Sequence, residues 1–176
     1  TWYVTGGDDP YLQERMMMGG ISAADLDRDC LVDIYVANGG APGNALYRNA
    51  GTGAFNDATF GSGLGLVGEY SSSAFADLDG DGHLDAVVGG TVKQATRLFR
   101  GDGLLGFSEV SGAGGISARS GTYSITAADY DLDGRLDLFL THWSASGATL
   151  EKHLWRNSGN GSFASALGSS GLSGQY

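Results

Sequence analysis

The sequence predicts an all-β fold, a β-propeller-type array of three four-stranded blades. Three observations predict it. One pattern recurs every 52 residues, short β-branched or aromatic runs alternate with glycine-rich turns, and no stretch keeps a 3.6-residue apolar period over the length of a helix. Units of about 50 residues with four strands each are typical of propeller blades, which bury their faces against one another.

Each copy contains four strand-like segments in the same order. A run of apolar and small residues, such as ISAA at 21–24, precedes an acidic loop, and a β-branched or aromatic run such as DAVVGG follows it. A third run places an aromatic residue beside an arginine, as in LYRN, LFRG and LWRN. After a glycine turn, the fourth run begins at Phe55, Phe107 or Phe163. The third copy carries an insertion between residues 141 and 153.

These segments place blade 1 at residues 21–60, blade 2 at 73–111 and blade 3 at 125–167. We expect residues 1–20 to be the remnant of a preceding blade plus a linker, and 168–176 to start a following repeat. Closed propellers have about 4–8 blades. Three blades therefore predict a partial ring, a piece of a longer chain, or a ring closed by oligomerisation, such as a homodimer with about six blades.

An acidic loop stands at the same place in every copy, with aspartates at its first, third, fifth and ninth positions. The three loops, DLDRDCLVD, DLDGDGHLD and DYDLDGRLD, hold 12 of the 20 acidic residues. Carboxylates held this close repel one another unless a cation joins them. Oxygen ligands at alternate positions of a tight loop are typical of Ca²⁺ sites, so we expect up to three Ca²⁺ ions, one per loop. They would change the formal net charge from −10 to −4.

Two other interpretations of the loops are weaker. An EF-hand needs a glutamate at position twelve and a helix on either side, whereas position twelve here is Val36, Val88 or Leu140 inside a strand-like run. A metal-free acidic turn would leave all these carboxylates without a counter-charge. Nothing in the sequence indicates an open catalytic metal site, so we expect calcium to be structural and to stabilise the folded state by binding it.

Composition excludes several function classes. The acidic balance and the lack of a basic run argue against a nucleic-acid partner, and no apolar run is long enough for membrane insertion. The single cysteine, Cys30, excludes an intramolecular disulfide. Calcium loops of weak affinity suit millimolar calcium, so we expect an extracellular, periplasmic or cell-surface location. The lack of an initiator methionine and a signal peptide indicates a mature or excised piece.

Two segments resemble a known family. They are DLDGDGHLD (77–85) followed by AVVGG, and LYRNAGTGAFNDAT (46–59). Both are similar to the FG-GAP/VCBS repeat, which forms the calcium-loop blades of integrin α-subunit propellers. The resemblance covers nearly the whole chain in three registers and implies a β-propeller and calcium. It does not imply one activity, because the family includes adhesion receptors, lectins and propeller-fold lyases.

The resemblance also implies a ligand set. In such a loop the side chains at positions one, three, five and nine coordinate the ion together with the carbonyl of position seven. The implied ligands are Asp25, Asp27, Asp29, Asp33 and the carbonyl of Leu31; Asp77, Asp79, Asp81, Asp85 and the carbonyl of His83; and Asp129, Asp131, Asp133, Asp137 and the carbonyl of Arg135.

The first loop departs from this pattern at its sixth position. It has Cys30 where the others have Gly82 and Gly134. If that position needs a positive φ, a residue other than glycine costs roughly 1 kcal/mol. We therefore predict that the first loop binds calcium most weakly.

Other recurring or unusual residues have two interpretations each. The arginines at 48, 100 and 156 suit anion contacts or, preferably, ion pairs with a loop carboxylate. The aromatic residues at 47, 99 and 155 are typical of packing between blades. Trp143 and His142 lie in the inserted connection and are candidate ligand contacts, although a packing role suits Trp143 as well.

The sequence favours a non-enzymatic recognition or adhesion module that binds protein or carbohydrate. One alternative is the propeller portion of a secreted polysaccharide-degrading enzyme whose catalytic residues come from elsewhere. Another is a purely structural, self-assembling scaffold. No zinc motif, nucleophile elbow or phosphate-binding loop occurs in the sequence.

Overall fold

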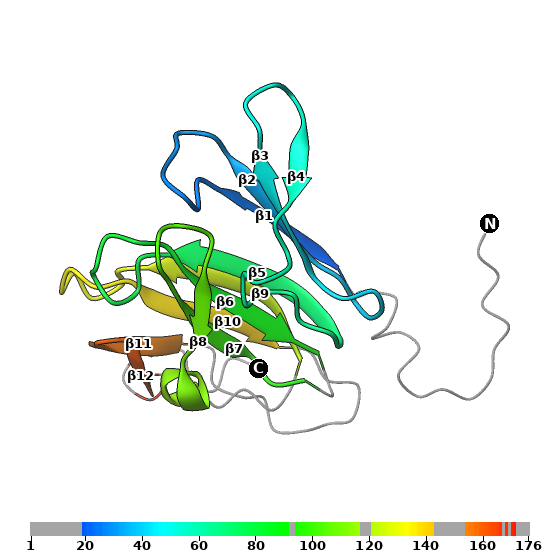
Figure 1. The fold of residues 1–176 in the computed structure, drawn as a ribbon. Helices are drawn as coiled ribbons and strands as arrows, with labels where there is room; N and C mark the ends of the chain where they lie inside the picture. Colours follow the sequence, from blue (N-terminus) through cyan, green and yellow to red (C-terminus); the bar gives the residue numbers. More distant parts are fainter. Residues whose placement is uncertain are drawn as a thin grey trace, which may run out of the picture.

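The computed structural model describes residues 19–91, 94–116, 121–142, 154–166, 168 and 170–171. These residues form three four-stranded antiparallel sheets, which confirms the predicted all-β array of three propeller-type blades (Figure 1). Blade 1 consists of β1 (Gly20–Ala24), β2 (Asp33–Ala37), β3 (Ala45–Asn49) and β4 (Phe55–Asp57). Blade 2 consists of β5 (Tyr70–Ala76), β6 (Asp85–Gly90), β7 (Arg97–Gly101) and β8 (Phe107–Glu109). Blade 3 consists of β9 (Thr122–Ala128), β10 (Asp137–His142), β11 (Leu154–Gly159) and β12 (Ser162–Ser165).

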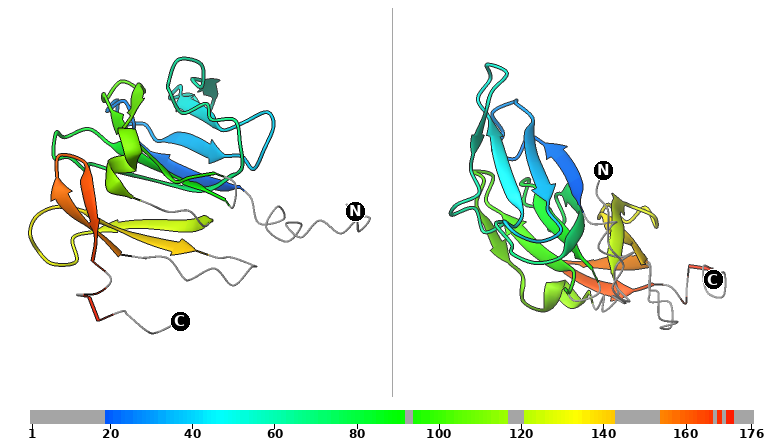
Figure 2. Two further views of the ribbon diagram at one scale, coloured as in Figure 1. Left: turned by 90° about the horizontal axis from the view of Figure 1, so that it is seen from below. Right: turned by 90° about the vertical axis from the view of Figure 1, so that its right-hand side faces the viewer.

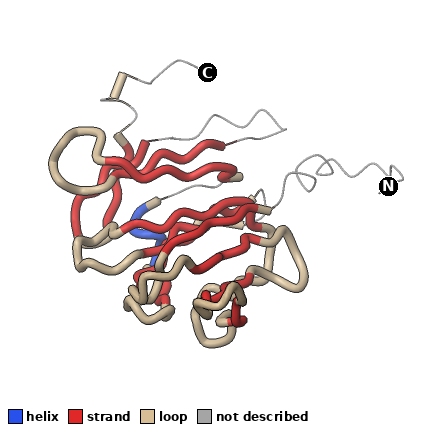
Figure 3. The backbone as a smooth tube through the Cα atoms, turned by 90° about the horizontal axis from the view of Figure 1, so that it is seen from above, coloured by secondary structure: helices blue, strands red, loops and turns tan. Residues whose placement is uncertain are grey.

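Each blade is a meander in which strands consecutive in the sequence pair with one another (Figure 3). A short 3₁₀ helix, η1 (Ser111–Gly115), follows blade 2. The first hairpin of every blade closes at the same register, through the pairs Ala24–Asp33, Ala76–Asp85 and Ala128–Asp137. The ninth aspartate of each acidic loop is therefore the first residue of the second strand, and the other three precede it in the turn.

The first strands of the blades, β1, β5 and β9, lie next to one another (Figure 2). Hydroxyl groups link them. The Ser22 hydroxyl lies 2.7 Å from the Ser73 hydroxyl and donates to the Ser73 carbonyl at 2.8 Å, and the Ser71 hydroxyl donates to the Thr122 carbonyl at 2.6 Å. Glycine is required at position 20, because a Cβ there would lie 2.6 Å from the Ser71 carbonyl oxygen. Small and hydroxyl-bearing residues thus allow the blades to approach closely.

Two hydrophobic cores form where the faces of adjacent blades meet. The core between blades 1 and 2 includes Tyr35, Leu46, Val88 and Phe99. The core between blades 2 and 3 includes Val87, Leu98, Leu138, Leu140 and Trp155. Leu64 and Ile116, at equivalent positions of the two connections between blades, each complete one core. Packing between blades is therefore the main apolar contribution to this fold.

The outer face of blade 1 is more exposed than the equivalent faces of the other two blades. Ile21 is 73% exposed, and Val36 is half-buried where the equivalent Val88 is fully buried. The packing prediction for the recurring aromatic residues is accordingly confirmed for Phe99 and Trp155, whereas Tyr47 is only half-buried. Most of the predicted remnant of a preceding blade and of the predicted following repeat lies outside the described residues.

Candidate metal centres in three acidic loops

The ninth aspartate of each loop is buried and connects the loop to two strands. In the second loop, Asp85 is 3% exposed. Its Oδ2 accepts the backbone N–H of Leu78 at 2.9 Å, and its Oδ1 accepts that of Gly101, in β7, at 3.0 Å. Asp33 and Asp137 make the equivalent pairs of bonds, to Leu26 and Asn49 and to Tyr130 and Asn157. This aspartate therefore holds the loop against its blade.

Burial is costly for an ionised carboxylate, and Asp85 shows the effect. The pKa of Asp85 is raised to about 6: desolvation by burial is the main cause, the two backbone N–H bonds oppose it, and the nearby Asp79 and Asp81 carboxylates add a smaller increase. A cation beside this carboxylate would favour its ionised form.

The first aspartate of each loop accepts N–H groups from residues later in the same loop. Asp77 accepts Gly80 at 2.8 Å and Gly82 at 3.0 Å, one on each carboxylate oxygen. Asp25 and Asp129 likewise accept the N–H groups of loop positions five and six. These bonds curl the loop around its first carboxylate, and the curl is what brings the aspartates together.

This curl requires a left-handed backbone at two positions. At the sixth position φ is +68° for Cys30 and +86° for both Gly82 and Gly134, so the condition on which the Cys30 prediction depends is met. The fourth position is left-handed as well, with φ of +63° at Arg28 and +59° at Leu132. The sequence analysis missed this second position, because only the second loop has glycine there, as Gly80.

In every loop, one oxygen from each of three carboxylates lies within 4.8 Å of the other two. The groups are Asp25, Asp27 and Asp29; Asp77, Asp79 and Asp85; and Asp129, Asp131 and Asp137. The remaining implied side-chain ligands, at positions 33, 81 and 133, lie outside these groups. The position-seven residues Leu31, His83 and Arg135 donate their N–H to the position-five carboxylate at 2.8–3.0 Å. An all-oxygen carboxylate set of this kind fits a hard cation such as Ca²⁺.

An arginine from the third strand of each blade pairs with the outer side of its loop. Arg48 contacts Asp27 at 2.5 Å and Asp29 at 2.7 Å. Arg156 contacts Asp131 at 2.6 Å and Asp133 at 2.9 Å, and Arg100 contacts Asp79 at 2.5 Å. The ion-pair interpretation of these arginines is confirmed. The carboxylates raise the pKa of Arg48 and Arg156, through hydrogen bonds first and charge second. The sequence analysis missed a further pair, between Arg135 and Asp133.

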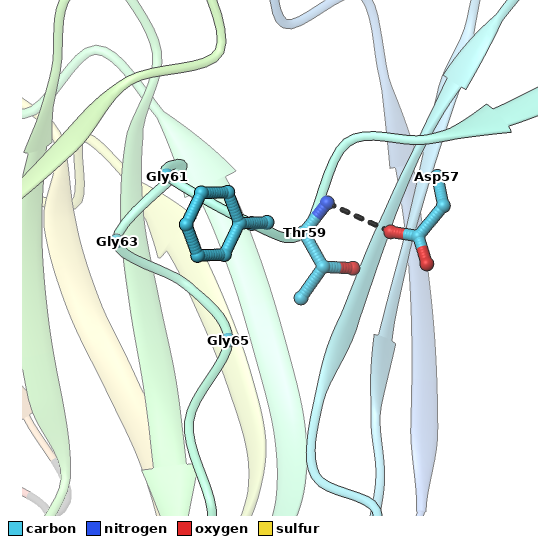
Figure 4. Close-up of a pocket in the computed structure, with 6 residues that line it drawn as sticks. Asp57, Thr59, Gly61, Gly63 and Gly65 are labelled. Carbon is cyan, nitrogen blue, oxygen red and sulfur yellow. Dashed lines mark hydrogen bonds between the residues drawn. The ribbon is translucent and has the colours of Figure 1, made fainter.

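A separate cavity of about 660 Å³ lies where blade 1 leads into the connection to blade 2 (Figure 4). Its lining residues are Asp57, Thr59, Phe60, Gly61, Gly63 and Gly65. The sequence analysis did not single it out. Two other residues were predicted from the sequence as ligand contacts. Trp143 lies outside the described residues, and the Nδ1 atom of His142 lies 3.2 Å from the Thr122 hydroxyl.

The sequence matches a family model described as FG-GAP-like repeat twice, over residues 25–88 and 77–140. The chain belongs to the FG-GAP-like repeat family. Among solved structures, the FG-GAP-like chain is similar to a lectin from Agrocybe aegerita that specifically recognises non-reducing terminal N-acetylglucosamine. The TM-score is 0.52 and the identity 21%, over 84% of this chain and 38% of the lectin chain. This likeness supports the propeller fold. A comparison with curated proteins found no match.

The FG-GAP-like chain thus spans 38% of that lectin's length. None of the described helices is both long and apolar enough to cross a membrane.

Proposed function

We propose that this FG-GAP-like array is a calcium-binding, non-enzymatic recognition module that works outside the cell and binds carbohydrate or protein. The observation that carries the calcium part is the threefold recurrence of an acidic loop in which three carboxylates converge within 4.8 Å. Calcium favours several oxygen ligands in a flexible shell, which such a loop supplies. Extracellular calcium is abundant enough to fill sites of modest affinity.

The role of the ion is structural. Each loop joins the first two strands of a blade, and its buried ninth aspartate already bonds both the loop and the third strand. A cation that joins the converging carboxylates, which include the ninth aspartate in the second and third loops, fixes the turn and offsets their repulsion. Since it binds only the folded loop, it stabilises the blade by linkage.

Carbohydrate is the first ligand class to test, because the similar lectin structure concerns a terminal sugar. We further propose that the exposed face of blade 1 pairs with another blade, supplied by a second copy or by the remainder of a longer chain. The support is that equivalent faces of blades 2 and 3 are buried in cores between blades.

Isothermal titration of the chelator-treated protein with Ca²⁺ tests the first part, with up to three ions expected per chain. No stoichiometric binding at millimolar free calcium would refute it. A glycan array paired with a reducing-end assay tests the second part. Glycan retention without new reducing ends is the expected result, and release of reducing ends would favour the enzyme alternative. The solution mass with and without chelator tests pairing between copies, and a monomer under both conditions contradicts it.

A further inference from the structure

The cavity beside blade 1 includes a residue that breaks the repeat. Phe60 is at the position of Gly112 in the second copy and Gly168 in the third. Two of three copies form the same blade without a side chain there, so the fold does not require an aromatic ring. Yet the Phe60 ring is fully exposed to solvent. An exposed aromatic ring beside a cavity offers a flat apolar surface that a ligand can cover.

The wall of the cavity is backbone rather than side chain. Gly61, Gly63 and Gly65 alternate along the connection, and Figure 4 shows them across the cavity from Asp57. Glycine is required at 63, where φ is +83° and a Cβ would lie 2.0 Å from the Phe107 carbonyl oxygen, whereas a Cβ at 61 would meet nothing within 4 Å. A ligand can therefore approach peptide groups directly.

The polar groups of the cavity include both an acceptor and donors. Asp57 Oδ1 accepts the Thr59 N–H at 2.9 Å, and bonds from Thr59 hold the pKa of Asp57 below its usual range. Asp57 is therefore an ionised acceptor. Within the described part of the chain, the backbone N–H groups of Gly61, Gly63 and Gly65 donate to no backbone carbonyl, and all three residues are exposed. Residues that carry an apolar ring, a carboxylate and backbone N–H groups free of backbone partners thus line one open volume.

We propose that this cavity binds a sugar ring, with Phe60 against its apolar face and with Asp57 and the glycine N–H groups on its hydroxyls. A hydroxyl both donates and accepts, so a polyol uses both kinds of group. A lysine side chain of a protein partner would use the carboxylate and the ring but leave the N–H donors without acceptors. The volume of about 660 Å³ lies within the range of small-molecule sites. This assignment rests on the carbohydrate branch of the proposed function.

The test is a ¹H–¹⁵N NMR titration of the full chain in calcium with N-acetylglucosamine, glucose, galactose and mannose, one at a time. At least one sugar is expected to give saturable shifts at the amides of Gly61, Gly63 and Gly65. Phe60→Gly, which copies the other two repeats, should weaken binding roughly ten-fold. Asp57→Ser, which copies Ser165 of the third repeat, should weaken it similarly, and Phe60→Tyr should retain it. The control is Leu104→Ala, which removes another exposed apolar side chain, and it should bind as the wild type does.

The outcomes separate the two levels of the proposal. Sugar binding that Phe60→Gly and Asp57→Ser leave unchanged refutes the cavity and leaves carbohydrate recognition standing. No response of the wild-type chain to any of the four sugars refutes carbohydrate recognition together with the cavity. Shifts of the same three amides with Nα-acetyl-lysine amide, and with no sugar, refute the assignment to a polyol. Equal melting temperatures of all variants show that the differences arise from binding.

Discussion

Replacing Cys30 by glycine should strengthen calcium binding at the first loop. Cys30 holds a φ of +68°, in the left-handed region that disfavours every residue with a Cβ. A side chain at the sixth loop position causes no steric clash, because a Cβ on Gly82 or Gly134 would meet nothing within 4 Å. The cost is therefore conformational, roughly 1 kcal/mol. If the ion orders the loop, relief of this strain tightens binding about five-fold.

Two matched variants isolate the backbone effect. Cys30→Ala removes the thiol but keeps the strain, so its affinity should equal that of the wild type. Gly82→Ala introduces the same strain into the second loop and should weaken that loop about five-fold. Calcium titration followed by the NMR signals of Leu31 and His83 reports the two loops separately. Equal affinities of the Cys30→Gly and Cys30→Ala variants at the first loop would refute the strain argument.

Three further predictions concern charge, packing and pH. Arg156→Gln should lower the melting temperature in chelator more than in millimolar calcium, since the ion supplies counter-charge in place of the guanidinium; equal losses in both conditions would contradict this. Leu64→Ala, at a fully buried position between blades, should lower the free energy of unfolding in urea by about 2–5 kcal/mol. In calcium-free protein the Asp85 carboxyl should titrate near pH 6 by ¹³C NMR. Because the unfolded chain ionises this group at a lower pH, the stability of the folded state falls as the pH rises towards 6. Calcium should lower that midpoint, because it binds the ionised form, and a midpoint that calcium leaves unchanged would argue against Asp85 as a ligand.

Repetition made most of the fold and the loops predictable. Residues that occur at one place in every copy make the same contact in every blade. Arg48, Arg100 and Arg156, for example, each form an ion pair with an aspartate of the acidic loop. The buried ninth aspartate was predictable in identity but not in its backbone bonds. Asp85 reaches Gly101 only because the third strand lies beside the second, and such a contact follows from tertiary packing.

Features that do not repeat were harder to predict. The left-handed fourth loop position was concealed by Arg28 and Leu132, residues that tolerate this backbone at a cost and leave no glycine signal. The Phe60 cavity depends on how the connection after blade 1 lies against β8, where the Ser62 carbonyl accepts the Phe107 N–H at 2.8 Å. No periodicity along the sequence encodes that contact.

The contacts of the loop aspartates also order the events of folding and ion binding. One of the two N–H groups that Asp85 accepts belongs to Gly101 and reaches it only once β6 and β7 have paired, so the position of Asp85 depends on the sheet. Asp79, farther out, is held by Arg100 from the same blade, which supplies positive charge without an ion. A loop with both contacts is partly neutralised before calcium arrives, and the ion completes the ordering of its turn. In the proposed function, calcium would therefore add to blades that their cores between sheets already support, in contrast to small domains in which metal binding is the folding step.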